Sequence, residues 1–296
     1  MSVADLRPRS AAELIDVAFR LWRRHLGAFA VLGAAAWLPL GAVGLLGALG
    51  LRSRALAALL VLSGPLGLLA ALWFALADAA MIVAAADAYH GRPCSAGSAI
   101  RRTWSVAGDV LRASSRKLAV LVVGPAVVAV GYGYALAALV PGARRWSPLA
   151  TEGAVVGLAL LTLALCTAWV AYYSARYALV PATIVIEEVD AGEGVERSHD
   201  LTRGRTRAVL AALSIAWACF LALQVTLAAA THAIPGASLR GAAVAQTLAQ
   251  GASAFLYPLI NTLVTALYFD LRVRQEGYDL HLLTRQLGAL APPTAA

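Results

Sequence analysis

The sequence has few charged residues and very little cysteine. Only 14% of its 296 residues are charged, against roughly 25% in an average soluble domain, and 60% are hydrophobic. The three cysteines, Cys94, Cys166 and Cys219, form no CxxC pair, so there is no disulfide framework and no zinc-ligand spacing. HExxH, GxSxG and paired-carboxylate arrangements are also missing. These absences leave an enzyme without positive support, and we expect no cofactor and no metal site.

Long apolar stretches dominate the chain instead. A helix needs about 20 apolar residues to cross a bilayer, because its backbone groups must find their partners within the segment. Six stretches are long enough, and they predict an all-α, polytopic membrane helical bundle that forms a single domain over residues 1–296. The predicted crossings are Leu26–Gly50, Ala55–Tyr89, Leu118–Val140, Thr151–Pro181, Val209–His232 and Gly241–Phe269.

Basic residues outnumber acidic ones by 24 to 16, and they are unevenly placed. Of the 24, 19 fall on the side of the predicted crossings that carries both termini. Cytoplasmic segments retain positive charge, so we expect a bacterial cytoplasmic (inner) membrane protein with both termini in the cytoplasm. The charge is spread over short segments without an aromatic-studded groove, which favours anionic membrane lipids as partners and argues against nucleic acid. A protein partner or a homo-oligomer is also compatible with this pattern.

Three similar amphipathic segments precede alternate crossings, and they begin at Ser10, Ser95 and Asp190. Their spacing predicts a threefold two-helix repeat, with units at about residues 10–94, 95–189 and 190–283 and a flexible tail over 284–296. Two interpretations stay open: these helices cover the cytoplasmic end of the bundle, or they form a surface for lipid or a protein partner. For the second, the candidate lipid-facing basic residues are Arg20, Arg23, Arg24, Arg101, Arg102, Arg112 and Arg116.

Asp78 is the clearest anomaly inside a predicted crossing, because a carboxylate in an apolar helix is costly and usually faces protein or a water-filled cavity. Arg176 lies toward the same end of another even-numbered crossing and is a candidate ion-pair partner. In the alternative interpretation, Arg176 extends to the lipid headgroups and Asp78 is neutralised or capped by a neighbour.

The segment ALYFDLRVRQEGYDLHLL, from Ala266 to Leu283, gathers charges where the last crossing should end. Two acid–base pairs in it have the four-residue spacing of helical ion pairs, and a glycine follows that permits a helix to end. We therefore expect an exit from the membrane and a cytoplasmic clamp. Its candidate residues are Asp270, Arg272, Arg274, Glu276, Gly277, Tyr278 and Asp279.

Three stretches resemble bacterial multi-pass proteins related to the membrane domain of glycerophosphoryl diester phosphodiesterase. They are YFDLRVRQEGYDL near the C-terminus, LRPRSAAELIDVAFRLWRRHLGAFAVLGAAAWLP near the N-terminus, and the central YALVPATIVIEEVDAGEGVERSHDLTRGR. The central stretch has Glu187, Arg197, Ser198, Leu201 and Gly204 at matching positions. The resemblance implies a helical membrane domain that stands alone, without the separate soluble barrel in which those enzymes carry out catalysis.

The sequence thus predicts a non-enzymatic integral membrane protein that acts as a scaffold, a partner subunit or a lipid-interacting domain. The alternative is a transporter for a lipid or small solute. Mitochondrial carriers are excluded as a specific identity, because Pro39 and Pro125 are not followed two positions later by an acidic residue.

Overall fold

The computed structural model describes residues 9–48, 53–143, 147–232 and 254–277, together with residues 241, 245 and 251. Within these residues the chain is helical and contains no strand, which confirms the predicted all-α class. The helices are α1 (Ala11–Arg24), α2 (Leu26–Ala48), α3 (Ser53–Tyr89), α4 (Ala96–Ser105), α5 (Ala107–Ala143), α6 (Pro148–Arg176), α7 (Val180–Glu187), α8 (Ala191–Thr202), α9 (Thr206–His232) and α11 (Tyr257–Glu276).

The three amphipathic segments form helices α1, α4 and α8, each with the expected N-cap. Ser10 and Glu13 make a reciprocal capping box at α1, in which each side chain accepts a hydrogen bond from the other's backbone N–H. Ser95 caps α4, and the Asp190 carboxylate caps α8. Polar side chains before each helix therefore satisfy backbone donors that the helix itself leaves unpaired.

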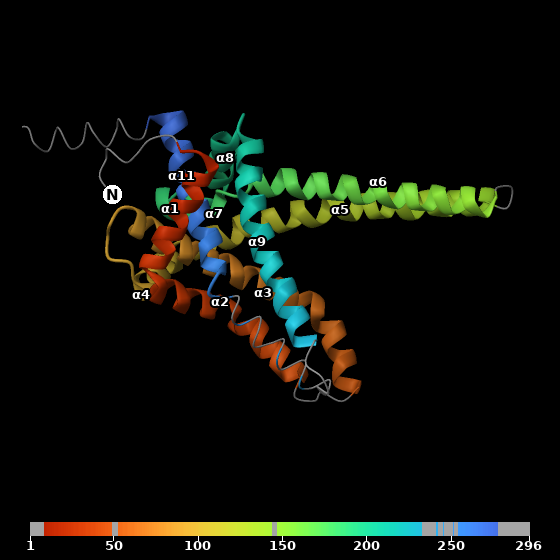
Figure 1. Cartoon of the computed structure of the whole chain (residues 1–296), viewed down its shortest axis with the longest axis horizontal. Coiled ribbons are helices and arrows are strands. Elements are labelled where there is room, and N and C mark those ends of the chain that lie inside the picture. The colour runs from red at the N-terminus through yellow and green to blue at the C-terminus, as the bar shows by residue number, and fades with distance from the viewer. Residues whose placement is uncertain are drawn as a thin grey trace, which may run out of the picture.

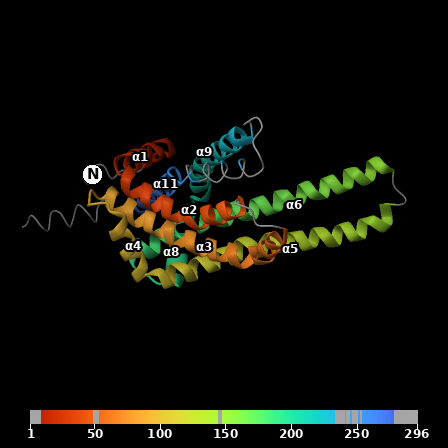
Figure 2. The same ribbon diagram turned by 90° about the horizontal axis from the view of Figure 1, so that it is seen from below.

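Long helices leave this short-helix layer as hairpins (Figures 1 and 2). Helices α2 and α3 lie against each other, as do α5 and α6, and the α5/α6 hairpin extends far from the rest of the molecule. Gly124 permits the close approach of α5 and α6, because a Cβ at this position would lie 2.1 Å from the Trp169 ring. The Trp169 indole N–H also donates to the Val120 carbonyl at 2.9 Å.

Four stretches of the described chain are long and apolar enough to cross a membrane: Gly67–Tyr89, Ala107–Ala138, Ala150–Glu187 and Thr206–Ala230. The described part of α2 adds a shorter apolar stretch, Leu26–Pro39. By their length and composition, these apolar helices indicate a membrane protein. The count of six crossings and the threefold repeat stay predictions. A repeat would place similar elements after each hairpin, but among the described helices α4 follows α3 directly, whereas the short helix α7 lies between α6 and α8.

The predicted fourth crossing, Thr151–Pro181, is not one continuous helix. Helix α6 ends at Arg176, and a separate short helix, α7, begins at Val180. Pro181 explains the break, because proline lacks the N–H of a helix interior but fits the first turn of a new helix, where it lies here.

The C-terminal part of the predicted sixth crossing, Gly241–Phe269, lies in helix α11, which ends with Gly277 as its C-cap, as the spacing of its charged pairs and this glycine predicted. Helix α11 continues past Phe269 to Glu276, and most of its side chains are buried against α1, α3, α9 and the helices around them. The buried hydroxyls of Thr262 and Thr265 donate to carbonyls one turn earlier, both at 2.8 Å, so they need no partner from outside the helix. Helix α11 is thus the central element of the core.

Candidate functional site

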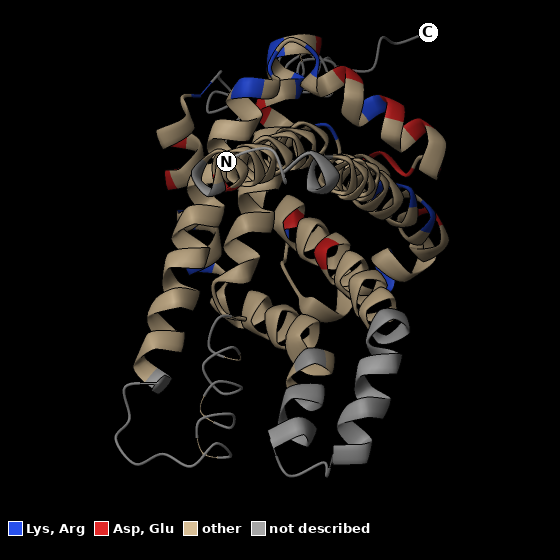
Figure 3. Ribbon diagram, turned by 90° about the vertical axis from the view of Figure 1, so that its right-hand side faces the viewer, with Lys and Arg blue, Asp and Glu red and all other residues tan. Residues whose placement is uncertain are grey.

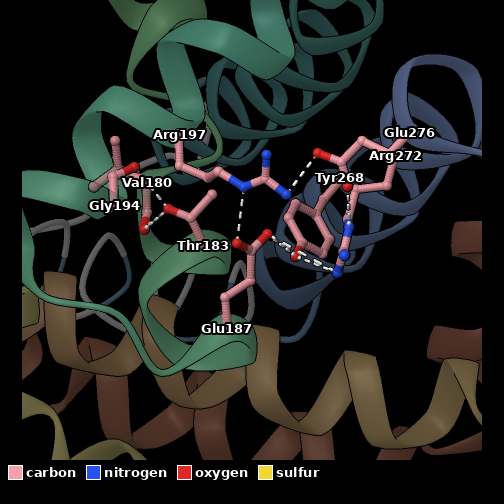
Figure 4. Close-up of polar contacts among 8 residues, drawn as sticks. All are labelled: Val180, Thr183, Glu187, Gly194, Arg197, Tyr268, Arg272 and Glu276. Atoms are coloured by element: carbon pink, nitrogen blue, oxygen red, sulfur yellow. Dashed lines mark hydrogen bonds and ion pairs between the residues drawn. The ribbon is translucent and has the colours of Figure 1, made fainter. Parts of the chain in front are cut away.

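A network of two glutamates, two arginines and a tyrosine joins α7, α8 and α11 (Figure 4). Glu187, the last residue of α7, accepts from Arg197 Nε at 2.9 Å and from the Tyr268 hydroxyl at 2.6 Å. Glu276 forms an ion pair with Arg197 at 2.5 Å and accepts a hydrogen bond from Arg272 Nε at 2.9 Å. Arg272 also lies 3.9 Å from Glu187, so the charges balance within the network.

The turn between α7 and α8 positions Glu187 and Arg197 (Figure 4). Glu188 adopts a left-handed conformation with φ 57°, which ends α7. The Thr183 hydroxyl then bridges the two helices through a 2.8 Å bond to the Gly194 carbonyl. Gly194 is needed for this approach, because a Cβ there would lie 2.6 Å from Ile184.

The electrostatics of the network keep its arginines charged. Burial alone would lower the pKa of Arg197, but its hydrogen bond to Glu187 and the charges of Glu187 and Glu276 raise that pKa overall. The pKa of Arg272 is also raised, with Tyr268 and Glu276 opposing the effect of burial. A guanidinium whose pKa rises does not release a proton at neutral pH, so the arrangement is suited to holding helices together and unsuited to proton transfer.

A second cluster ties the N-terminal segment to α11 and α3. The Asp270 carboxylate accepts from Arg274 Nε at 2.7 Å and from the Arg9 backbone N–H at 2.7 Å. Arg274 donates back to the Arg9 carbonyl at 2.6 Å, and the Arg9 guanidinium donates to the Tyr89 hydroxyl at 2.8 Å. Residues far apart in the sequence are therefore fixed at one point.

The predicted clamp residues are located as follows. Both expected ion pairs of α11 form, Asp270 with Arg274 and Arg272 with Glu276. Gly277 ends the helix with φ 61°, as a left-handed C-cap. Tyr278 and Asp279 lie outside the described residues. These charges are not on an exposed surface: they lie in and around the core, because their partners come from α7, α8 and the segment before α1. The exit from the membrane at this point stays a prediction.

The predicted Asp78–Arg176 ion pair is not formed. Asp78 accepts hydrogen bonds from Tyr257 and Asn261 on α11, while Arg176 donates to the Tyr172 hydroxyl at 3.0 Å and lies over its ring. The basic residue that shares the surroundings of Asp78 is Lys117 on α5. The sequence could not reveal this, because it does not say which apolar helices are neighbours.

The seven candidate lipid-facing arginines fall into two groups. Three have carboxylate partners: Arg20 pairs with Asp16, Arg102 with Asp87 at 3.1 Å, and Arg112 with Asp109 at 2.7 Å. The other four are exposed and have no ion pair within the described part of the chain. Three further exposed arginines around the α8–α9 turn share this property. We call these seven the free arginines: Arg23, Arg24, Arg101, Arg116, Arg203, Arg205 and Arg207.

Sequence reasoning missed the role of Lys117, and it found Glu187 and Arg197 only through a resemblance. One local signal was present for Glu187, a carboxylate directly after the apolar run VPATIVI. Nothing in its spacing points to Tyr268 or Arg272, more than 80 residues further along the chain.

In the described ranges, no group of three His, Cys, Asp or Glu side chains is placed to hold a metal ion. The polar groups are instead arranged as helix-to-helix ties and as an exposed basic surface. No protein-family model, no curated protein and no solved structure matches this chain.

Proposed function

We propose that this chain is a non-enzymatic, lipid-interacting membrane domain that binds anionic headgroups through its free arginines and serves as a scaffold or partner subunit. The observation that carries the proposal is that these exposed arginines form no ion pair with a carboxylate within the described structure. We further propose the bacterial cytoplasmic membrane as its location, with both termini in the cytoplasm, and kinship with the phosphodiesterase membrane domain that the sequence resembles.

The distribution of charge supports this proposal. Most charged residues lie in the upper part of the view in Figure 3, while the helices that extend downward in this view are mostly uncharged. An arginine near an anionic membrane surface contributes about 1 kcal/mol of attraction, and the effect falls off within a Debye length. Several free arginines at one end of a membrane protein therefore favour anionic over neutral lipid.

The apolar neighbours of the free arginines support the same placement. On α4, Trp104 is 69% exposed and Ile100 is 44% exposed, close to Arg101. Exposed apolar and basic side chains on one short helix are typical of a helix that lies in the headgroup region, with the aromatic ring at the boundary.

Native mass spectrometry of the purified chain tests the proposal by comparing retained phosphatidylglycerol with retained phosphatidylcholine. We expect the wild type to retain phosphatidylglycerol preferentially and to lose it as salt is raised. The Arg101→Gln/Arg116→Gln variant should lose much of this preference. The matched control, Arg20→Gln/Arg112→Gln, should lose less, because those guanidinium groups already donate to Asp16 and Asp109. Equal loss in both variants, or no lipid preference in the wild type, contradicts the proposal.

A transporter for a lipid or small solute is the second candidate, and a single observation favours it. Asp78 lines a cavity within a membrane-spanning stretch, as an ion or solute pathway requires. In a background without Cys94, Cys166 and Cys219, we expect a cysteine at position 78 to react with a small water-soluble thiol reagent if the cavity belongs to a pathway. Full protection of that cysteine counts against transport.

A further inference from the structure

A cavity of about 170 Å³ lies between α3, α5 and α7. Its lining side chains are apolar except for Asp78 on α3 and Ser114 and Lys117 on α5. Figure 2 shows α3 and α5 running beside each other in this part of the molecule. One water needs only about 10–15 Å³ of such space, so the cavity has room for a group of several heavy atoms.

Helix α11 fixes the orientation of the Asp78 carboxylate. The Tyr257 hydroxyl donates to Oδ1 at 2.8 Å, and the Asn261 amide donates to the same oxygen at 3.1 Å. No side chain of the described structure donates to the second oxygen, Oδ2. Asp78 is therefore held firmly on one side and has an unused acceptor on the other.

Lys117 and Ser114 offer unused donors on the opposite wall. They are three residues apart on α5 and so share one face of the helix. Ser115 donates to the carbonyl one turn earlier, whereas neither Ser114 nor Lys117 has a hydrogen bond or ion pair within the described part of the chain. Lys117 and Asp78 line the same cavity and act on each other electrostatically, but no hydrogen bond or ion pair within the described structure joins them.

An ammonium and a carboxylate that face a cavity in an apolar span, each incompletely satisfied, are costly in the absence of a ligand. We propose that this cavity binds a zwitterionic group that carries a primary ammonium and an acidic phosphate or carboxylate. The ligand's acidic oxygens accept from Lys117 and Ser114, and its ammonium donates to Oδ2 of Asp78.

A zwitterion fits this pair of walls better than a singly charged ligand does. An anion alone pairs with Lys117 but is repelled by the carboxylate of Asp78. A cation alone pairs with Asp78 but is repelled by the ammonium of Lys117. A quaternary ammonium has no N–H to donate to Oδ2. The group comes either from a lipid headgroup or from a soluble compound. The free arginines do not line this cavity, so binding here does not depend on the proposed function.

The test uses the purified full chain and equal amounts of two lipids without net charge, phosphatidylethanolamine and phosphatidylcholine, so that the anionic lipid expected at the free arginines does not compete. Native mass spectrometry measures which lipid is retained, and soluble phosphoethanolamine is tested separately by its effect on the thermal unfolding midpoint. For a lipid ligand we expect preferential retention of phosphatidylethanolamine. For a soluble ligand we expect phosphoethanolamine to raise the midpoint. Absence of both effects in the wild type overturns the proposal.

Three variants show whether the cavity is responsible. Lys117→Met and Asp78→Asn should each lower the preferred ligand's binding by about tenfold or more, since each removes a charged hydrogen bond. Arg116→Met, next to Lys117 but outside the cavity lining, should leave it unchanged. Lys117→Met should keep the wild-type fold by circular dichroism, because it removes an unpaired charge. Asp78→Asn retains an oxygen for Tyr257 and Asn261. Unchanged binding in either cavity variant overturns the proposal.

Discussion

Arg197 should be one of the most important single side chains for the stability of the helical core. Its guanidinium is the only group of the described structure that bonds both Glu187 on α7 and Glu276 on α11 at hydrogen-bonding distance. In Arg197→Met both bonds are lost, although Tyr268 and Arg272 still partly satisfy the two carboxylates. The substitution therefore acts on three helices at once.

The magnitude follows from the geometry. A hydrogen bond between charged groups contributes roughly 1.5–3 kcal/mol, but the Arg197 side chain is 31% exposed and solvent screens part of its attraction. With the remaining partners in place, we expect Arg197→Met to lower the free energy of unfolding by about 2–3 kcal/mol. Unfolding in mixed detergent micelles, followed by circular dichroism, measures the loss.

The control is Arg203→Met, which removes an exposed arginine just beyond the end of the same helix. It should change the free energy of unfolding by no more than about 0.5 kcal/mol. Arg197→Met combined with Glu276→Gln should cost less than the sum of the single substitutions, because the two residues are in contact. If Arg197→Met costs no more than the control, or if the double variant is additive, the network does not stabilise the fold as described.

Three further predictions concern packing and pH. Gly194→Leu should lower the free energy of unfolding by about 1–3 kcal/mol, since even its Cβ would lie 2.6 Å from Ile184. Gly124→Ala should separate α5 from α6, because the added methyl would overlap the Trp169 ring, and spin labels on the two helices should report a longer distance. Burial, and then the charge of Arg176, lowers the pKa of His199, so the unfolded chain binds the proton more tightly. The stability from neutral His199 is fully present above its ordinary pKa of about 6.5, and unfolding experiments should show it lost as the pH falls through the lowered pKa.

Matched variants separate these effects from general damage. Gly97 and Gly131 are exposed, and a Cβ at either position would meet no atom within 4 Å, so Gly97→Leu and Gly131→Ala should behave nearly as the wild type. If Gly97→Leu and Gly194→Leu lower the free energy of unfolding equally, close packing at Gly194 is not the cause. If Gly124→Ala and Gly131→Ala give the same spin-label distance, close packing at Gly124 does not set the separation of α5 and α6. His199→Phe keeps a ring beside Tyr177, which lies 5.0 Å from His199, and should weaken the acid-dependent loss. If stability depends on pH in the same way in His199→Phe as in the wild type, groups other than His199 cause the loss of stability at acid pH.

Local features of the fold could be predicted from the sequence. Ser10, Ser95 and Asp190 mark the starts of three short helices because each can accept from backbone N–H groups at a helix start. The two ion pairs of α11 could also be predicted, because their residues are four apart and helical geometry alone brings such residues together.

Long-range features could not be predicted in this way. The break before α7 depends on Pro181, and proline is tolerated in some membrane helices and ends others. Pairing Asp78 with Arg176 required knowing which helices are neighbours, and the apolar faces of membrane helices carry little information on that point. The burial of the α11 charges could not be predicted, because their partners Glu187, Arg197 and Arg9 lie far away in the sequence.

The central claim is that the short-helix layer with the free arginines lies in the lipid headgroup region. A nitroxide on a single cysteine at position 104, in a background without the three native cysteines, tests it most directly through collision with oxygen and with a water-soluble nickel chelate. In reconstituted vesicles we expect oxygen, which concentrates in lipid, to collide with this label more effectively than the chelate does. Full access of the chelate, equal to that of a label in water, would contradict the account.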